Sequence, residues 1–171
     1  MASFILCCGC NKPAVPASSE KKTSPEMQSV FYLDHAQPKL HTIKLWLGAQ
    51  ELIAECATNN IQRNTGMMYR EQMAENEAML FVFPAPMEMA FYMRNTRIPL
   101  SCAYIDSEGV IQEIYDMKPL EETPISSVSD KIQYVLEVRQ GWFGRNKISP
   151  GTSVRTELGT LNETFFGRRK F

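Results

Sequence analysis

The chain has 171 residues, of which 44% are hydrophobic and 22% charged, which suits one globular domain with a sizeable core plus a tail. Its formal net charge of -1 provides no general field to attract nucleic acid or an anionic surface, so we expect no nucleic-acid partner. No apolar run in the body of the chain reaches the roughly 18 residues that a membrane span needs. Any membrane link is therefore expected at the N-terminus.

The N-terminus carries three cysteines after a short apolar run. Residues 2–10 read ASFILCCGC and are followed by a polar segment. Apolar residues that end in Gly-Cys look like a bacterial lipoprotein signal, so residues 1–10 are predicted to be a signal remnant with Cys10 as the lipidation site. The segment lacks the positive n-region and full-length h-region of a secretory signal. The alternatives are a cytoplasmic N-terminus with exposed thiols and a metal cluster, although the spacing lacks the paired pattern of a zinc site.

Residues 11–38 are rich in Pro, Ser, Lys and Glu, and we predict that they form a flexible tether. A brief apolar interruption at residues 30–33 could be a short strand that docks on the domain. With a lipidated Cys10, the predicted location is the cell envelope, lipid-anchored or exported. A cytoplasmic location is the alternative, and an N-terminal lipid anchor is the only expected contact with a membrane.

The predicted globular domain covers residues 39–159, and residues 160–171 form a basic C-terminal tail. The domain begins with a hairpin, because apolar and polar residues alternate over residues 43–47 and again over residues 52–56, across a turn that Gly48 opens.

A short helix is expected next. Thr58 is its expected N-cap, and Gly66 should end or bend it.

Several strands are expected after the helix. Residues 78–83 are continuously apolar and stop at Pro84, which predicts a strand buried on both faces. Alternation over residues 87–93 predicts another strand, with Met87, Met89 and Met93 on one face.

The second half of the chain continues the strand pattern. Residues 100–105 and 110–115 predict a hairpin across the acidic turn between them, and residues 132–138 alternate as a strand does. About seven short strands with frequent turn signals favour a mainly β fold, a small single-domain antiparallel β-barrel or sandwich with one or two short helices.

Four motifs in one order suggest a family. They read GMMYR at residues 66–70, MLFVF at 79–83, MRNT at 93–96 and IPL at 98–100. This order resembles the bacterial and archaeal domain of unknown function 192, also called uncharacterised protein family 0127. The resemblance covers roughly residues 42–157 and implies a β-rich single domain of no agreed activity.

Two arginines are the first candidates for a binding site. If the segment after Thr58 is one continuous helix, Arg63 and Arg70 lie on one face with their guanidiniums about 10 Å apart. Arginine makes planar contacts to carboxylate and phosphate, so the pair suits an anion. The alternative is that both arginines brace the helix against Glu55, Glu71 or Glu137.

A second polar cluster comprises Arg94, Asn95, Thr96 and Arg97, and could converge with the first. The alternative is that its amide and hydroxyl satisfy backbone groups in a turn. The resemblance carries Arg70, Asn95 and Thr96 over to family motif positions and places Arg63 in a family-like one. It also shows two departures, with Ser101 where the family often has an acid and Tyr92 where it usually has Trp.

Asp106 occupies a position that matches the family, and it is the candidate acid or base if the protein is an enzyme. An aspartate that opens a hairpin turn is more often structural. Conventional enzyme motifs are absent, and both histidines lie at the edge of the predicted domain. Cys56 and Cys102 lie in apolar strand patterns that indicate buried thiols, with a bridge between them as the alternative in an exported protein.

Eight of the ten methionines lie between Met67 and Met117. Thioethers can bind copper(I), but methionine is also an adaptable core residue, and we expect no cofactor or metal.

These observations predict an envelope-tethered β-domain that binds a small anionic ligand or a partner through Arg63, Arg70, Asn95, Thr96 and Asp106. One alternative is an enzyme of unknown reaction that uses the same cluster with Asp106. Another is an envelope assembly factor that offers a sheet edge or an aromatic patch near Trp142 and Phe143 to an envelope protein.

Overall fold

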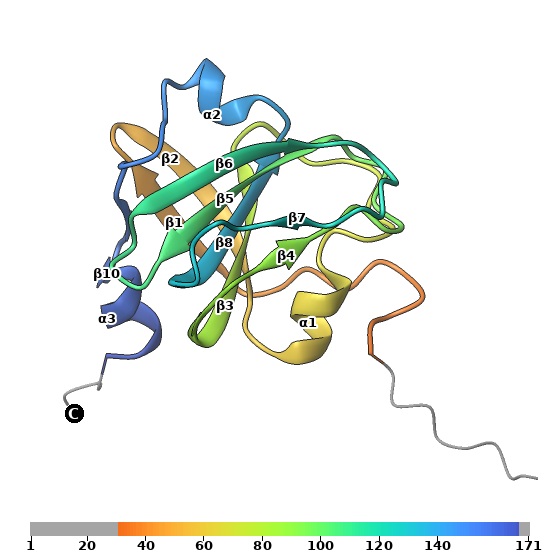
Figure 1. Ribbon diagram of the computed structural model, residues 1–171, viewed down its shortest axis with the longest axis horizontal. Helices are drawn as coiled ribbons and strands as arrows, with labels where there is room; N and C mark the ends of the chain where they lie inside the picture. Colours follow the sequence, from red (N-terminus) through yellow and green to blue (C-terminus); the bar gives the residue numbers. More distant parts are fainter. Residues whose placement is uncertain (1–30, 168–171) are drawn as a thin grey trace, which may run out of the picture.

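The computed structural model describes residues 31–167, and Figure 1 shows the course of the chain. Within these residues the chain forms ten strands and three short helices: β1 (Thr42–Leu47), β2 (Gln50–Ala57), α1 (Asn60–Thr65), β3 (Glu77–Met87), β4 (Ala90–Phe91), β5 (Leu100–Asp106), β6 (Ile111–Met117), β7 (Ile125–Ser126), β8 (Ile132–Arg139), α2 (Trp142–Arg145), β9 (Val154–Thr156), β10 (Gly159–Thr160) and α3 (Leu161–Phe165). The signal-like segment with Cys10 and most of the predicted tether lie outside the described residues. None of the helices in the described range is long and apolar enough to cross a membrane.

The strands form one large sheet and one small ribbon. The large sheet has the order β10-β9-β1-β2-β3-β8-β5-β6, and β4 pairs with β7 separately. The large sheet is not closed into a barrel, although a bridge between Val110 and Ser153, with backbone hydrogen bonds beside it, joins the start of β6 to the segment before β9. The predicted mainly β single domain is confirmed.

One strand pair departs from the predicted antiparallel arrangement. The pair β2–β3 is parallel, whereas the other neighbouring pairs in the two sheets are antiparallel. A parallel pair needs a crossover connection, and α1 with the segment after it carries the chain back to the start of β3. The two predicted hairpins are present as β1–β2 and β5–β6.

Helix α1 is shorter than a continuous helix from Thr58 to Arg70 would be. Its N-cap is Asn59 rather than Thr58, with a capping box to Gln62. The helix ends at Gly66, where φ is 48° and an added Cβ would lie 3.2 Å from Phe81 Cζ. The premise that placed Arg63 and Arg70 on one helical face is therefore wrong.

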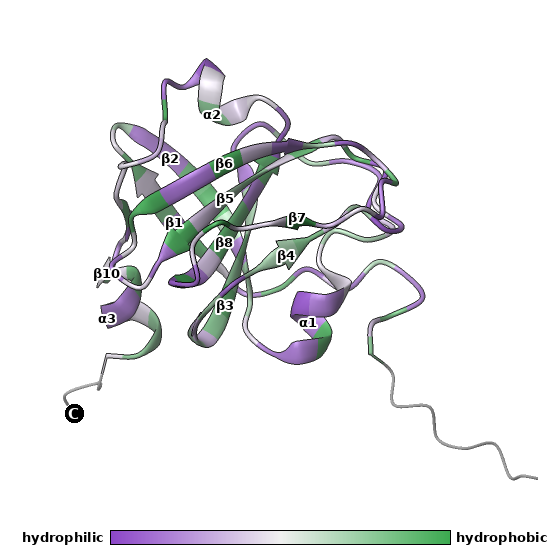
Figure 2. Ribbon diagram, in the orientation of Figure 1, coloured by the Kyte–Doolittle hydropathy of each residue, from purple (hydrophilic) through white to green (hydrophobic). Residues whose placement is uncertain are grey.

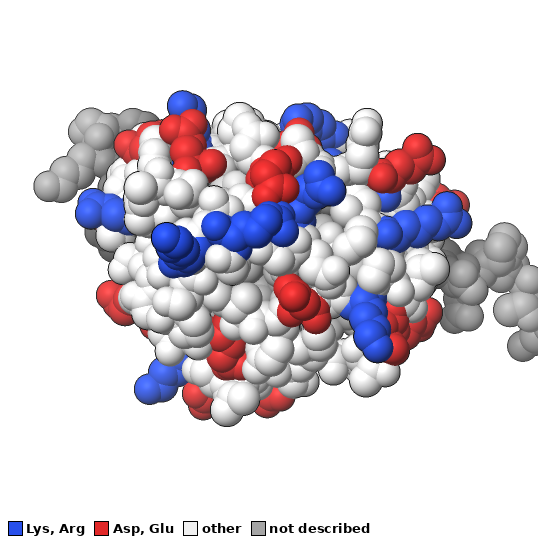
Figure 3. All heavy atoms as spheres, turned by 90° about the horizontal axis from the view of Figure 1, so that it is seen from above, with Lys and Arg blue, Asp and Glu red and all other residues white. Residues whose placement is uncertain are grey.

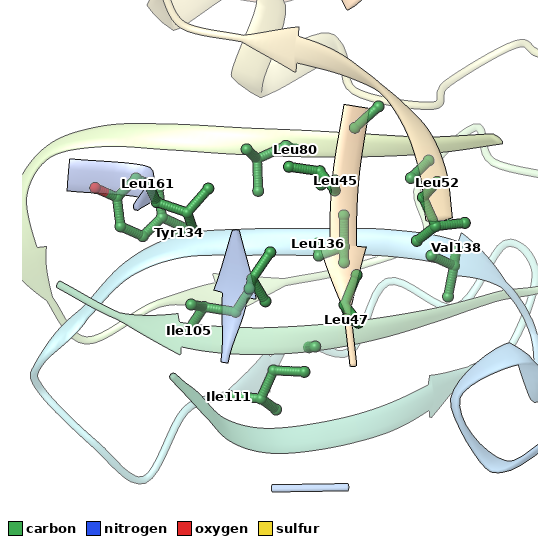
Figure 4. Close-up of a cluster of buried hydrophobic side chains, with 14 of the residues drawn as sticks. Leu45, Leu47, Leu52, Leu80, Ile105, Ile111, Tyr134, Leu136, Val138 and Leu161 are labelled. Carbon is green, nitrogen blue, oxygen red and sulfur yellow. The ribbon is translucent and has the colours of Figure 1, made fainter. Parts of the chain in front are cut away.

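The central strands are buried on both faces, as the sequence predicts for residues 78–83. The concave face encloses the first core, and Figure 4 shows side chains from opposing strands pointing toward one another there. Its members include Leu45, Leu80, Ile105 and Leu136, with exposed fractions of zero. Figure 2 shows hydrophobic residues along these strands, whereas α1 is mainly hydrophilic.

A second core covers the outer face of β3, β8 and β5. It contains Met79, Phe81, Cys102 and Tyr104 and is closed by residues of the segment after α1 and of the β4 region. Because successive residues of a strand point to opposite faces, β3, β5 and β8 each contribute to both cores.

The predicted strand over residues 87–93 is present only in part. Strand β3 continues to Met87, and a separate short strand, β4, follows at Ala90–Phe91. Met87 is 53% exposed, while Met89 and Met93 are buried. The three thioethers therefore do not form one equivalent row.

Both margins of the domain extend beyond the predicted boundaries. Leu161 of α3 is fully buried in the first core, so the residues directly after 159 belong to the domain. Gln37 is buried and donates a hydrogen bond of 2.8 Å to the carbonyl of Gly66. Trp142 and Phe143 of α2 are 3% and 2% exposed, so the predicted aromatic surface patch is wrong.

Candidate functional site

Arg70 lies in the segment after α1 and is held by Glu55 of β2. Its Nη1 and Nη2 donate hydrogen bonds of 2.7 and 2.9 Å to the two carboxylate oxygens. The side chains are only 18% and 10% exposed. The Arg70 charge is therefore already neutralised inside the protein, in the planar two-bond geometry that an anionic ligand would need.

Arg63 points to the backbone rather than to an acid. Its Nη1 donates to the carbonyls of Thr58 and Val82 at 2.7 and 2.8 Å, and its Nη2 donates to Asn60 Oδ1 at 2.6 Å. The guanidinium also lies over the ring of Phe83, 5.1 Å from the centroid. Arg63 thus joins α1 to the middle of β3.

Asn95 pairs with Tyr69, and both residues have positive φ angles, 53° and 62°. The Tyr69 N–H donates to the Asn95 carbonyl at 2.8 Å, and Asn95 Nδ2 donates to the Tyr69 hydroxyl at 2.7 Å. The buried Thr96 donates through its hydroxyl to the carbonyl of Arg94 at 3.1 Å. These polar groups fix two adjoining turns.

Asp106 organises the β5–β6 turn. Its Oδ1 accepts hydrogen bonds of 2.9 Å from the N–H groups of Glu108 and Val110, and its Oδ2 accepts one of 2.7 Å from Gln112. Asp106 ends β5, whereas Asn95 and Thr96 precede the start of β5, and a strand of this length spans about 20 Å. The structure therefore does not bring Asp106 together with the Asn95–Thr96 cluster.

Ser101 stands where the resemblance suggested an acid. Its hydroxyl donates to Asp116 Oδ1 and accepts a hydrogen bond of 2.8 Å from the N–H of Gly141. Ser101 thus ties β5 to β6 and to the start of α2.

A cavity of about 370 Å³ opens between α1 and β4. We call it the α1–β4 pocket, and both elements are visible side by side in Figure 1. Its walls come from α1 and its following turn, from β3, from the β4 region and from β8: residues 63–68 and 87–92, Phe81, Phe83, Thr96 and Glu137. Of the predicted site residues, Arg63 and Thr96 reach this pocket, while Arg70, Asn95 and Asp106 do not line it.

Aromatic rings form much of the apolar wall. Phe91 of β4 meets Phe81 edge to face at 4.9 Å between centroids, and it also contacts Phe83 at 6.4 Å. Behind them, Phe91 contacts Tyr104, whose hydroxyl donates to the carbonyl of Ile125 of β7. The β4–β7 ribbon is thereby fixed over the second core.

Glu137 of β8 is the buried acid of the pocket. It is 4% exposed, and its Oε2 has no hydrogen-bond partner among the described residues. It stands between Met79 of β3 and Cys102 of β5 in the sheet register. Burial raises the pKa of the Glu137 carboxyl to about 8, so the group is mainly protonated at neutral pH.

Cys102 lies opposite this acid, and Cys56 lies in the first core. Burial, with the Glu137 charge second, raises the pKa of Cys102 to about 12. Burial likewise raises the pKa of Cys56 to about 12. Both cysteines are buried and free, so the alternative of a Cys56–Cys102 bridge is wrong for this structure.

Sequence reasoning placed Glu137 on the polar side of an alternating strand and so missed it. Tyr134, Leu136 and Val138 share one face of β8, whereas Ile132 belongs to the second core on the other. Strand β8 lies between β3 and β5, and both its faces are covered. The apolar Val135, on the same side of the strand as Glu137, was a signal that this side is covered. No group of three or more His, Cys, Asp or Glu that could hold a metal occurs within residues 31–167.

The surface outside the pocket has mixed charge. Basic and acidic side chains are interspersed on the face seen in Figure 3. Long-range steering of one charge type is therefore weak on this face.

Comparisons with known proteins give a family and a fold. The family DUF192, described as an uncharacterised ACR, matches residues 43–156. A candidate transcription regulator from Sinorhizobium meliloti 1021 is 31% identical with a TM-score of 0.65, over 71% of this chain and 98% of that one. A protein of unknown function from Novosphingobium aromaticivorans DSM 12444 is 26% identical with a TM-score of 0.62, over 70% and 93%. No curated protein matches the chain.

Proposed function

Because the chain belongs to the DUF192 family of uncharacterised proteins, we propose its function from its own geometry: it binds a small, mainly apolar molecule in the α1–β4 pocket. The observation that carries this proposal is a preformed cavity whose walls are mainly apolar. Its volume of about 370 Å³ falls in the range of roughly 300–1,000 Å³ that is usual for small-molecule sites.

The character of the walls supports an apolar occupant. Phe81, Met67 and Met89 line the pocket and are buried members of the second core. Methionine side chains adapt to irregular shapes, and aromatic rings provide large flat contact surfaces. An apolar ligand would gain stability by covering apolar wall surface that is still exposed, such as that of Met87, which is 53% exposed.

Binding fits the pocket better than catalysis does. Its lining contains no His, Cys, Ser or Lys among the described residues that could act with Glu137 as a nucleophile or second proton carrier. Asp106, the acid of the enzyme alternative, serves the β5–β6 turn through Glu108 and Val110.

A small anionic ligand is the second candidate, because Arg63 lies in the pocket wall. Three of its hydrogen bonds already go to protein oxygens, so an anion would compete with Thr58, Val82 and Asn60. A ligand without a negative charge would leave these three hydrogen bonds in place.

The test uses the full chain in thermal-shift measurements with octanol, octanoate and octylamine, three probes with one chain length and different head groups. Octanol should raise the melting temperature, because binding to the folded state alone is stabilising. The variant Ala90→Trp should abolish the shift, since Ala90 is exposed at the pocket wall and a ring there occupies the cavity.

The matched control is Leu158→Trp, which adds a ring at an exposed position that does not line the pocket. It should leave the octanol shift unchanged. An absence of any shift with all three probes, or an equal shift in Ala90→Trp, would rule out the proposed binding site. A shift with octanoate alone would favour the anionic ligand.

We also propose, from the sequence alone, that Cys10 tethers the domain at the cell envelope. The full chain expressed in bacteria should then enter the membrane fraction, and mass spectrometry should find a lipid on the N-terminal peptide. Cys10→Ser should abolish both results. A wild-type chain that stays in the soluble fraction without lipid would contradict the tether.

A further inference from the structure

The carboxyl of Glu137 presents hydrogen-bonding capacity that the protein does not use. Its Oε2 is buried without a partner in the described part of the chain, and the residue lines the α1–β4 pocket. A buried oxygen without a partner carries a desolvation penalty, which a hydrogen-bond donor placed in the pocket would remove. Because Glu137 also lines the α1–β4 pocket, a ligand there would lie beside this carboxyl.

The other charged and titratable groups near Glu137 do not supply this donor. Arg63, Glu88 and Tyr92 also line the pocket, and Arg63 is bound to protein oxygens. From β5, Cys102 lies opposite Glu137 and Tyr104 lies two residues further along that strand. The Tyr104 hydroxyl is committed to the carbonyl of Ile125. From β3, the residue opposite is Met79, which does not titrate.

We propose that the α1–β4 pocket is specific for primary amines with an apolar chain, whose ammonium group binds Glu137 while the chain lies among the methionine and phenylalanine side chains. This inference rests on the proposed binding function and names the ligand class. An ammonium group offers three donors on a compact head, and it has no lone pair to oppose the carboxylate. Its charge also compensates the buried carboxylate, which an alcohol cannot do.

Proton release follows from this pairing. Because burial raises the pKa of Glu137 to about 8, the free protein holds a proton there at pH 7. The bound ammonium favours the ionised carboxylate, so Glu137 loses its proton to the solvent as the complex forms. Free alkylammonium and protonated Glu137 thus yield an ammonium–carboxylate pair and one solvent proton.

The pH dependence of amine affinity follows the same balance. Affinity should rise about tenfold from pH 6 to pH 7 and less steeply toward pH 8, where Glu137 of the free protein ionises without help. Octanol affinity should stay level over this range, since an alcohol leaves Glu137 protonated. Cys102 does not contribute in this window, because its pKa is raised to about 12.

The experiment is titration calorimetry of the full chain with octylamine, octanol and octanoate, at pH 7 in two buffers that differ in ionisation enthalpy. The buffer dependence of the heat counts the protons released, and close to one is expected for octylamine and none for octanol. Glu137→Gln keeps the shape of the side chain without the charge. It should abolish proton release and weaken octylamine at least tenfold.

A control variant tests whether the thiol opposite Glu137 contributes to proton release. Cys102→Ala removes the opposing thiol and should leave proton release by octylamine intact.

The outcomes distinguish the inference from the function on which it rests. If octanol binds but octylamine binds no tighter and releases no proton, the amine inference is overturned and the apolar pocket stands. If octanoate binds tighter than octylamine, the inference is overturned in favour of an anion at Arg63. If none of the probes binds, the proposed function fails and the inference fails with it.

Discussion

Arg70 and Glu55 form a two-bond ion pair, with Nη1–Oε1 and Nη2–Oε2 distances of 2.7 and 2.9 Å, beneath a nearly complete cover of protein. Glu55 Oε2 also accepts a hydrogen bond of 2.7 Å from the N–H of Leu40. The pair therefore joins three segments, namely β2, the chain before β1 and the loop after α1. Arg70, which the resemblance carries to a family motif position, thus has a structural partner in Glu55.

Replacing Arg70 by Ala should lower the free energy of unfolding by about 3 kcal/mol, because it leaves the Glu55 charge buried and unpaired. Urea unfolding of the two proteins measures this difference. The double variant Arg70→Leu with Glu55→Leu should recover most of the loss, since it removes both charges. A single variant as stable as the wild type would show that the pair contributes little and would release Arg70 for ligand binding.

Glu137 should make stability fall as pH rises. Its pKa is raised from 4.5 to about 8 in the folded protein, so the folded state keeps a proton that the unfolded state has lost between those pH values. The contribution of protonated Glu137 to the free energy of unfolding is fully present below about pH 4.5. It is lost progressively up to about pH 8, at about 1.4 kcal/mol per pH unit.

The comparison with Glu137→Gln isolates this effect, because other carboxyls titrate identically in both proteins. Urea unfolding at several pH values should show that the free energy of unfolding of the variant rises relative to that of the wild type toward pH 8. Parallel stability curves for the two proteins would contradict a protonated Glu137 in the folded state.

Gly66→Ala should destabilise the protein by about 1–3 kcal/mol, because φ is 48° there and the new methyl would meet the Phe81 ring at 3.2 Å. Gly48→Ala is the matched control, since φ is 59° and no atom lies within 4 Å of the new methyl. Thermal unfolding should rank Gly66→Ala below Gly48→Ala. Equal losses would mean that backbone strain alone, without the Phe81 contact, decides the cost.

Asp106→Ala should lower the free energy of unfolding by about 1–2 kcal/mol, because two N–H groups of the β5–β6 turn lose their shared acceptor. Asp106→Asn should cost less, since it keeps an oxygen at Oδ1. Neither variant should change octanol binding. A variant with wild-type stability that loses a function of the protein would instead support Asp106 as a catalytic group.

Local patterns in the sequence determined much of this molecule. Alternation over residues 43–56 and 132–138 identified β1, β2 and β8, and the apolar run at 78–83 identified a strand buried on both faces. Hairpin turns and strand periodicity depend on neighbouring residues, so they can be read without knowledge of the fold. Motif order also gave the family, which the match over residues 43–156 confirms.

The tertiary structure decided which side chains meet. Gly66 ends α1 because φ is positive and Phe81 packs against it, and Arg70 consequently turns to Glu55 rather than to Arg63. In the sequence Glu137 was only a possible ion-pair partner of Arg63 or Arg70, whereas the order β3-β8-β5 and the cover over that face bury it. Burial on two faces is a property of strand order and layer packing, which involve residues far apart in the chain. Periodicity alone therefore assigns a residue to one side of a strand, and only the assembled layers decide whether that side faces water, a core or a pocket.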